Sequence, residues 1–351
     1  KRIGGTYYSI GIVPLGGYVR MVGDDPHELA DAQGEGPKEQ ESEKPSGSTE
    51  FMFQDGGGYD EVDKALMADR SKWFLEKGYL TKMAVVLAGP GFNILFAWLL
   101  AIGTFWYFGI ETPVDRAVIG DTIPGYPAEK AGLKSGDRVL SIDGQQVSDW
   151  RTLADIVRDS GGRELVLLIE RQHPEGGTVQ KLEIKVTGEP EDPELALLTN
   201  SEQSGSYLIG IRPGSQDVSV SLGEAFSAGS YHVLGTSVLT VRSLWLMLKG
   251  AISAKNIGGP IAIVKQAAVF AERGVAKLSL FIVFLSISLG IINLFPIPVL
   301  DGGHLLFFTI ELFKGAPLSL RFKEVTSQIG LVLLLALMLF AIGNDIINVA
   351  N

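Results

Sequence analysis

The sequence predicts a multi-pass α-helical membrane protein with a folded α+β domain inserted between two of its spans. Charge-free runs occupy residues 83–110, 278–300 and 325–344, and a spanning helix needs roughly 20 such residues. They predict transmembrane segments at 82–110, 276–313 and 325–345. Residues 114–213 differ, because short apolar segments alternate there with turns rich in Gly, Pro and Asp, which is typical of a small α+β domain.

Composition limits the classes of partner. The 351 residues are 46% hydrophobic, which suffices for a membrane portion and one modest folded domain. Disulfides are excluded because the chain has no cysteine. Residues 24–63 carry thirteen Asp or Glu against two Lys, so we expect 24–64 to be an acidic flexible loop rather than a binding tail. This charge argues against nucleic acid as a partner.

Three further segments flank the predicted spans. Residues 1–23 are rich in β-branched and aromatic residues punctuated by Gly, which predicts a short hairpin. Residues 65–81 are expected to form a basic amphipathic segment. Residues 220–274 predict an amphipathic helix and a linker, and not a span, because Arg242 and Lys249 interrupt the apolar run.

A proline-rich break in the segment 276–313 is the strongest candidate for a functional site. The run from Asn293 to Gly303 reads NLFPIPVLDGG. Pro296 and Pro298 lack a backbone N–H and disfavour helix in the residue before them, so we expect 295–300 to be extended, with unpaired backbone facing protein, water or a peptide. Asp301 follows, and a carboxylate at membrane depth costs about 3 kcal/mol on insertion scales, which marks a functional residue.

A simpler reading of the break stays open at this point. Asp301 would then only cap the N-terminus of a second half-helix, and the prolines would only produce a kink, since Asp is a favourable N-cap residue.

The run Asn-x-x-Pro-x-Pro-x-Leu-Asp-Gly-Gly resembles the signature of the site-2 proteases, which are zinc intramembrane metalloproteases. The resemblance implies that Asp301 is one protein ligand of a catalytic Zn²⁺. It also implies two histidine ligands and a glutamate base from a His-Glu-x-x-His helix. The four histidines here, His27, His173, His232 and His304, form no such motif. No catalytic residue is therefore assigned within this chain, and the motif is expected upstream of Lys1.

Two other stretches resemble segments of the same family. The run Val13-Pro14-Leu15-Gly16-Gly17-Tyr18-Val19 is similar to the family's membrane re-entrant β-sheet, and Gly89-Pro90-Gly91-Phe92-Asn93 is similar to part of its second transmembrane helix. An ordinary soluble hairpin and a plain interhelical hydrogen bond of Asn93 are the alternatives. Taken together, the resemblances imply these substrate-binding residues: Asn293, Pro296, Pro298, Gly16, Gly17 and Asn93.

Residues 123–144 resemble part of a PDZ domain, so the inserted domain is expected to be one over 114–213. Turns are predicted at Gly132, at 135–137 and at 143–144, with a strand over 138–142, a helix over 149–160 and paired strands over 164–171 and 179–186. In the circularly permuted arrangement the peptide-binding element comes last, which implies the following peptide-binding residues: Leu208, Ile209, Gly210 and Ile211. The alternative is a domain that acts only as a steric gate.

The resemblance implies an intramembrane zinc metalloendopeptidase of the bacterial inner membrane. Its substrates would be transmembrane segments of single-span proteins, such as anti-sigma factors already cut by another protease, and remnant signal peptides. The alternative is a catalytically inactive membrane scaffold that binds through its PDZ domain. A transporter with a broken helix would need an internal repeat, and we find none.

Orientation follows from the basic residues beside the spans. Lys314, Arg321 and Lys323 lie between the last two spans, and cytoplasmic loops carry an excess of Lys and Arg. We therefore expect residues 1–80 and 314–323 in the cytoplasm and the PDZ domain on the extracytoplasmic side.

Overall fold

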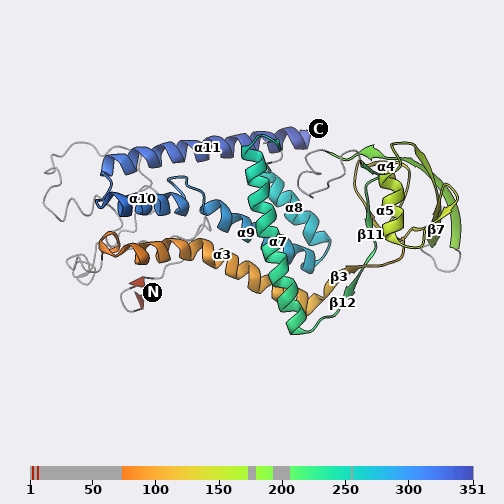
Figure 1. Ribbon diagram of the computed structural model, residues 1–351, viewed down its shortest axis with the longest axis horizontal. Coiled ribbons are helices and arrows are strands. Elements are labelled where there is room, and N and C mark those ends of the chain that lie inside the picture. Colours follow the sequence, from red (N-terminus) through yellow and green to blue (C-terminus); the bar gives the residue numbers. More distant parts are fainter. Residues whose placement is uncertain are drawn as a thin grey trace. The chain divides into compact units, whose positions relative to one another are not determined.

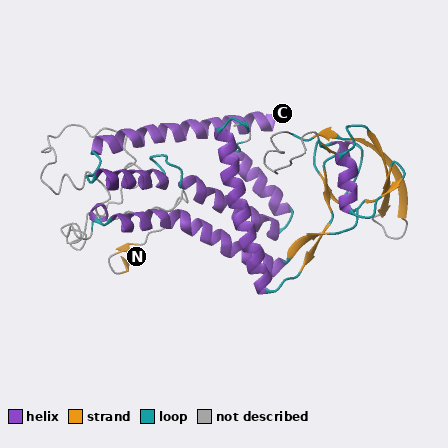
Figure 2. Cartoon of the chain, in the orientation of Figure 1, coloured by secondary structure: helices purple, strands orange, loops and turns teal. Residues whose placement is uncertain are grey.

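The computed structural model describes residues 2–3, 6–7, 73–172, 179–192, 206–253, 255 and 257–350. This part of the chain is mostly helical with several small sheets (Figure 2). The predicted acidic loop 24–64 lies outside the described residues. Of the predicted sheet 1–23, only an antiparallel pair is described, β1 (Arg2–Ile3) with β2 (Thr6–Tyr7). The chain divides into two compact units, one of residues 1–90 and 293–334 and the other of residues 91–292 and 335–351.

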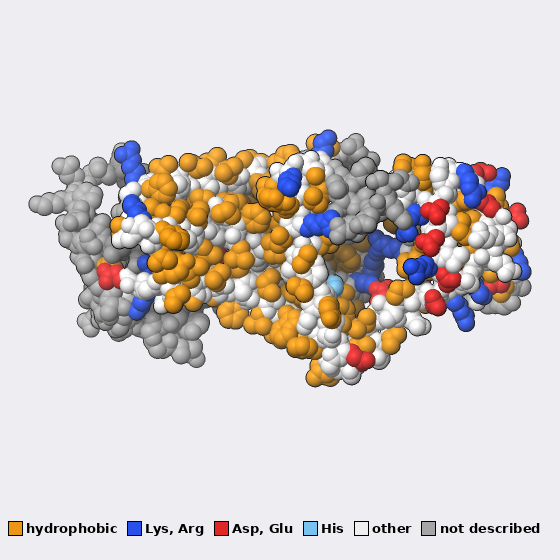
Figure 3. All heavy atoms as spheres, in the orientation of Figure 1, with side chains coloured by type: hydrophobic (Ala, Val, Ile, Leu, Met, Phe, Trp, Pro, Cys, Tyr) orange, Lys and Arg blue, Asp and Glu red, His pale blue; other side chains and the backbone are white. Residues whose placement is uncertain are grey.

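Three helices are long and apolar enough to cross a membrane, which confirms the predicted long apolar helices. They are α3 (Tyr79–Phe108), α9 (Val275–Asn293) and α11 (Leu320–Ala350). Most side chains on the helices are hydrophobic, whereas charged side chains gather on the strand-rich part of the chain (Figure 3). The broken span is completed by α10 (Asp301–Lys314), and the short 3-10 helix η3 (Phe74–Glu76) precedes α3.

The helix α7 (Leu222–Leu248) corrects the amphipathic prediction for this region. It begins with a capping box between Ser221 and Glu224. Its buried side packs closely on α3, because a Cβ at Gly229 would lie 2.8 Å from Cγ1 of Ile102. Its opposite side is also apolar, with Tyr231, Leu234 and Val238 exposed, so this helix does not have one polar and one apolar face.

A helix, α8 (Pro260–Glu272), occupies most of the predicted linker and is capped by the end of α11. The buried carboxylate of Asp345 accepts hydrogen bonds from the backbone N–H groups of Gly259 (2.9 Å), Ile261 (3.0 Å) and Ala262 (3.0 Å). These are the N–H groups that a helix start leaves unpaired, and a carboxylate also suits the helix dipole. A Cβ at Gly259 would lie 2.6 Å from Oδ2 of Asp345, so the approach requires glycine.

Residues 110–218 form the inserted module, which is enclosed by the pairing of its first and last strands, β3 (Ile110–Pro113) and β12 (Ser215–Val218) (Figure 1). Its largest sheet is antiparallel, with the order β6-β5-β7-β8. These strands are β6 (Gln145–Gln146), β5 (Arg138–Ile142), β7 (Glu164–Gln172) and β8 (Val179–Thr187). The module also contains two smaller antiparallel strand pairs and two helices. The pairs are β4 (Ile119–Thr122) with β11 (Ile211–Pro213) and β9 (Glu189–Pro190) with β10 (Tyr207–Leu208). The helices are α4 (Pro127–Lys130) and α5 (Trp150–Arg158).

The predicted turns of the module are present. Gly132 and Gly136 have φ of 82° and 89°, and Asp143 and Gly144 have φ of 51° and 81° between β5 and β6. This left-handed backbone favours glycine, and Asn or Asp after it. The Asp143 carboxylate accepts a hydrogen bond from the N–H of Val166 (2.9 Å) and pairs with Arg163, and both contacts lower its pKa.

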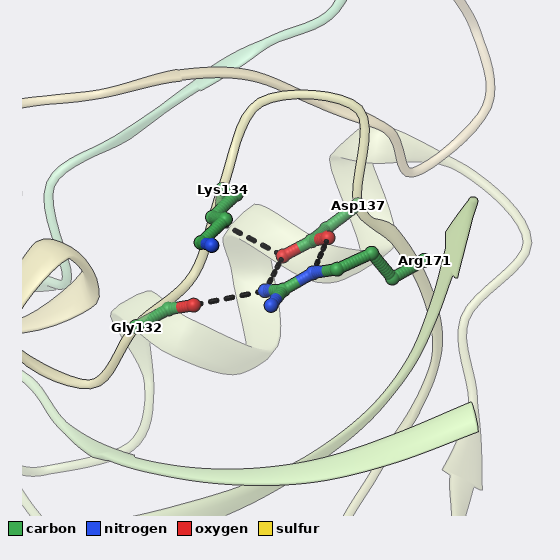
Figure 4. Close-up of polar contacts among 4 residues, drawn as sticks. All are labelled: Gly132, Lys134, Asp137 and Arg171. Carbon is green, nitrogen blue, oxygen red and sulfur yellow. Dashed lines mark hydrogen bonds and ion pairs between the residues drawn. The ribbon is translucent and has the colours of Figure 1, made fainter. Parts of the chain in front are cut away.

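A buried ion pair ties the loop before β5 to β7 (Figure 4). The carboxylate of Asp137 is fully buried and accepts two hydrogen bonds from Arg171, from Nε at 2.6 Å and from a terminal nitrogen at 2.7 Å. It also accepts the backbone N–H of Lys134 at 2.8 Å, while Arg171 donates to the carbonyl of Gly132 at 2.8 Å. The hydrogen bonds to Asp137 raise the pKa of Arg171, so the guanidinium stays charged.

Candidate functional site

The loop between α9 and α10 is folded into tight turns, which corrects the prediction of an extended strip. The N–H of Ile297 donates to the carbonyl of Phe295 at 2.7 Å, and the N–H of Leu300 donates to the carbonyl of Ile297 at 2.8 Å. Pro296 and Pro298 therefore occupy inner positions of two successive turns. The fixed φ of proline suits such positions, so the same restriction that disfavours helix produces turns here.

The two glycines after Asp301 allow this loop to lie directly on the first turn of α10. A Cβ at Gly302 would overlap the carbonyl oxygens of Leu294 and Phe295, and a Cβ at Gly303 would lie 2.5 Å from Cα of Pro298. Both positions thus require glycine for close backbone approach and not for a special φ. The sequence motif contains both glycines but does not by itself indicate this role.

A third glycine supports the loop from α11. A Cβ at Gly330 would lie 3.0 Å from Cγ2 of Val299 and 3.2 Å from Cδ of Pro298. The loop is therefore held between the start of α10 and the middle of α11. No sequence signal identified Gly330, because it lies in an apolar run far from the motif.

Asp301 is the first residue of α10, and its carboxylate is not used as a cap. Leu300 is the N-cap residue and makes no side-chain capping bond. Within the described part of the chain, no hydrogen bond or ion pair of the half-buried Asp301 carboxylate is found. It lies against α3 at Gly89, where a Cβ would be 3.3 Å from Oδ2. The reading of Asp301 as a helix cap is therefore wrong.

The chemistry of Asp301 fits one position of a zinc site. Carboxylate oxygen is a common Zn²⁺ ligand in proteins, and this half-buried carboxylate lies beside the exposed Gly89. The described residues contain no group of three His, Cys, Asp or Glu that could hold a metal ion. They therefore fit a single protein ligand and not a complete coordination shell.

The other predicted substrate-binding residues are distributed over both units. Asn293 is the last residue of α9 and is half-buried, as is Pro298, whereas Pro296 is exposed. Asn93 belongs to the second unit, where its backbone carbonyl accepts a hydrogen bond from the Ser286 hydroxyl at 2.8 Å. The predicted residues Gly16 and Gly17 lie outside the described residues.

The predicted peptide-binding residues of the module lie in its last strands. Leu208 ends β10 and Ile211 begins β11, both half-buried. Ile209 is 1% exposed and part of the core of the module, and its assignment to peptide binding stays a prediction. Gly210 has φ of 78° and packs against Tyr126.

Comparison with known proteins identifies the family. A model described as peptidase family M50 matches residues 1–337. The protein named "Putative zinc metalloprotease BH06270" of Bartonella henselae is 32% identical over 352 residues, covering 97% of this chain and 87% of that protein. The "Regulator of sigma-E protease RseP" of Escherichia coli is 36% identical over 245 residues, covering 66% of this chain and 50% of that protein.

"Protease RseP" of Yersinia pestis is similar to the same extent, with 35% identity over 238 residues that cover 66% of this chain and 51% of that protein. The alignments thus span about half the length of these two RseP relatives. Because the family model matches nearly the whole chain and a relative named as a zinc metalloprotease aligns over 97% of it, the chain belongs to peptidase family M50, the site-2-type zinc metalloproteases.

Proposed function

We propose that the full-length protein is an intramembrane zinc endopeptidase that cleaves transmembrane segments of single-span membrane proteins. The observation that carries this proposal is the carboxylate of Asp301, which a loop of tight turns holds at the break of a span without a capping bond. An ionisable group at membrane depth is costly, and among the described residues this one makes no hydrogen bond and has His304 as its electrostatic neighbour. Binding of a metal ion would account for a carboxylate at this position, whereas packing of the helices does not.

In this proposal Asp301 supplies one anionic ligand, and a His-Glu-x-x-His segment outside these 351 residues supplies the others and the general base. When bound, zinc polarises the scissile carbonyl and activates water for attack. The turns and the glycines of the motif keep the carboxylate in one place, which avoids reorganisation during the reaction. Asn293 is proposed to donate its amide N–H to the substrate backbone, and the exposed ring of Pro296 to contact the substrate side chains.

The proposal predicts metal-dependent cleavage. The full-length protein in detergent or liposomes should cut a peptide that contains one transmembrane segment, should lose this activity on removal of zinc by a chelator, and should regain it when zinc is returned. Cleavage products are measured by mass spectrometry. Cleavage that continues in metal-free protein would exclude the zinc mechanism, and zinc-loaded protein that never cleaves would favour the inactive scaffold.

We also propose that the inserted module is a circularly permuted PDZ domain that selects substrates already shortened by another protease. Its late strands β10 and β11 flank Ile209 and Gly210, whose backbone N–H groups donate to no other described residue. Such N–H groups are what a PDZ domain offers to a peptide carboxylate. The ends of the module are joined by the N–H of Val114, which donates to the carbonyl of Gly214 at 2.7 Å, so the module can be removed and its ends connected.

Removal of residues 115–213 with a short Gly/Ser connection should preserve cleavage of a pre-shortened substrate and permit cleavage of the intact one. The reason is that the module lies between spans in the sequence and contributes neither Asp301 nor its loop. Cleavage of both substrates is compared on immunoblots in cells. If the deletion variant is inserted and folded but no longer cuts the shortened substrate, the module has a role beyond selection.

The proposed orientation in the bacterial inner membrane places the link between α10 and α11 in the cytoplasm and the module outside, following the positive-inside rule. These 351 residues contain no cysteine, so single cysteines introduced here are labelled without background from this part of the protein. Gln180→Cys on exposed β8 should react with an impermeant thiol reagent in intact cells, and Ala316→Cys only after permeabilisation. The reverse labelling pattern would invert the topology.

A further inference from the structure

We infer that Gly89 is a positioning residue for the Asp301 carboxylate: the missing side chain at this point of α3 leaves the space that the carboxylate needs in order to ligate zinc. This inference rests on the proposed function. Small residues in membrane helices generally allow two helices to pack closely. Gly89 is inferred to have a more specific role, which is to leave space for one atom, Oδ2 of Asp301.

The geometry distinguishes Gly89 from the other glycines of the same helix. Among the described residues, a Cβ added at Gly89 would meet one atom within 4 Å, Oδ2 of Asp301 at 3.3 Å, whereas Cβ atoms at Gly91 and Gly103 would meet none. The backbone at Gly89 is otherwise exposed. The neighbour of this glycine is therefore the carboxylate and not a packed helix surface, so packing alone does not account for it.

Contacts nearer the start of α3 hold it against α10 and prevent an easy shift apart. The hydroxyl groups of Tyr79 and Thr309 lie 3.4 Å apart, and the Lys82 ammonium lies 5.4 Å from the ring centre of Phe308. The backbone of Asp301 is in turn held by the loop packed on Gly302. With both backbones held, a side chain at position 89 would displace the carboxylate itself.

A side chain at position 89 is expected to move the Asp301 carboxylate only slightly but to weaken zinc binding strongly. A contact of 3.3 Å is tighter than most real Cβ contacts, so alanine should move the carboxylate oxygen by a few tenths of an ångström. Metal–ligand distances hold within about 0.2 Å, and changes that only misplace a ligand typically cost about 10–100-fold in metal affinity. We expect a loss of that size for Gly89→Ala and a greater one for Gly89→Val.

The test uses the full-length protein with all its metal ligands and measures zinc affinity by competition with a chromophoric chelator. The visible absorption of the Co²⁺-substituted protein reports ligand geometry independently of activity. Gly89→Ala should weaken zinc binding about 10–100-fold and alter the Co²⁺ spectrum, while the matched control Gly91→Ala should retain both. Gly89→Ser carries the same Cβ and provides a second variant should the alanine protein not fold.

Wild-type zinc affinity and an unchanged Co²⁺ spectrum in a folded Gly89 variant would overturn the inference. An equal loss in Gly89→Ala and Gly91→Ala would also overturn it, because the effect would then belong to α3 as a whole. The Asp301→Asn variant distinguishes failure of the role inferred for Gly89 from failure of the ligand role proposed for Asp301. If that variant loses zinc and Gly89→Ala does not, the inference fails alone; if Asp301→Asn binds zinc as the wild type does, the proposed function of Asp301 fails first.

Discussion

Asp301→Asn should strongly reduce both zinc content and peptide cleavage in the full-length protein while folding and membrane insertion are preserved. The amide keeps the shape of the side chain but removes the anionic oxygen. Groups that only hydrogen-bond to a metal ligand already cost about 10–100-fold when they are substituted, so the loss of a ligand should exceed that range. Bound zinc is measured by atomic emission and cleavage with a transmembrane peptide.

The structure indicates that this substitution would change the proposed ligand without disturbing the helix that carries it. Because Leu300 is the N-cap residue and the Asp301 side chain caps nothing, Asn at this position should not destabilise α10. Asp217→Asn, on the exposed strand β12, is a matched control that changes a carboxylate elsewhere. An Asp301→Asn protein with wild-type zinc content and wild-type cleavage would refute the ligand assignment. Retained zinc with lost cleavage would instead indicate that the carboxylate acts on the substrate.

Arg171→Met should destabilise the inserted module by about 3–5 kcal/mol, the cost expected when one partner of a buried ion pair is removed. The Asp137 carboxylate is 0% exposed, and without Arg171 it would keep only the N–H of Lys134 as a hydrogen-bond donor among the contacts described. The effect should appear as a lower unfolding temperature of the module and faster proteolysis within it, measured on the purified full-length protein.

The matched control is Arg138→Met on the neighbouring strand. Arg138 lies 3.7 Å from Glu170, and both side chains are partly exposed, so this pair should contribute about 0–1 kcal/mol. Equal destabilisation by the two substitutions would show that the buried ion pair contributes no more to the stability of the module than the exposed pair. The double variant Asp137→Leu with Arg171→Met should recover part of the loss, because no unpaired charge then remains buried.

Local patterns predicted the elements of this protein well where one short segment determines its own conformation. The strand Arg138–Ile142 and the turn at Asp143 and Gly144 are found as predicted, because Asp-Gly in a two-residue hairpin loop favours a tight turn in which both residues have positive φ. The three spans were equally predictable, since length and the absence of charge suffice for a helix in hydrocarbon.

The predictions that failed concern segments whose conformation depends on distant residues. Residues 295–300 were expected to be extended, but they fold into turns that fit onto Gly302 and Gly303. Residues 220–274 were expected to be an amphipathic helix and a linker, but a second helix lies within this range, Pro260–Glu272, and its start is capped by Asp345, 86 residues from Gly259 in the chain. Neither partner can be identified from the segment itself.

The sequence by itself determined that this chain has several segments long and apolar enough to span a membrane, carries an inserted α+β module and places one carboxylate at a break in one of these segments. These properties follow from composition and from motifs only a few residues long. Only the tertiary structure decided that Asp301 is left uncapped, that its loop is closed by Gly302, Gly303 and Gly330, and that its carboxylate faces Gly89. The physical reason is that these are close approaches between segments separated by up to about 200 residues, and hydrophobic patterning specifies which residues are apolar but not which atoms meet.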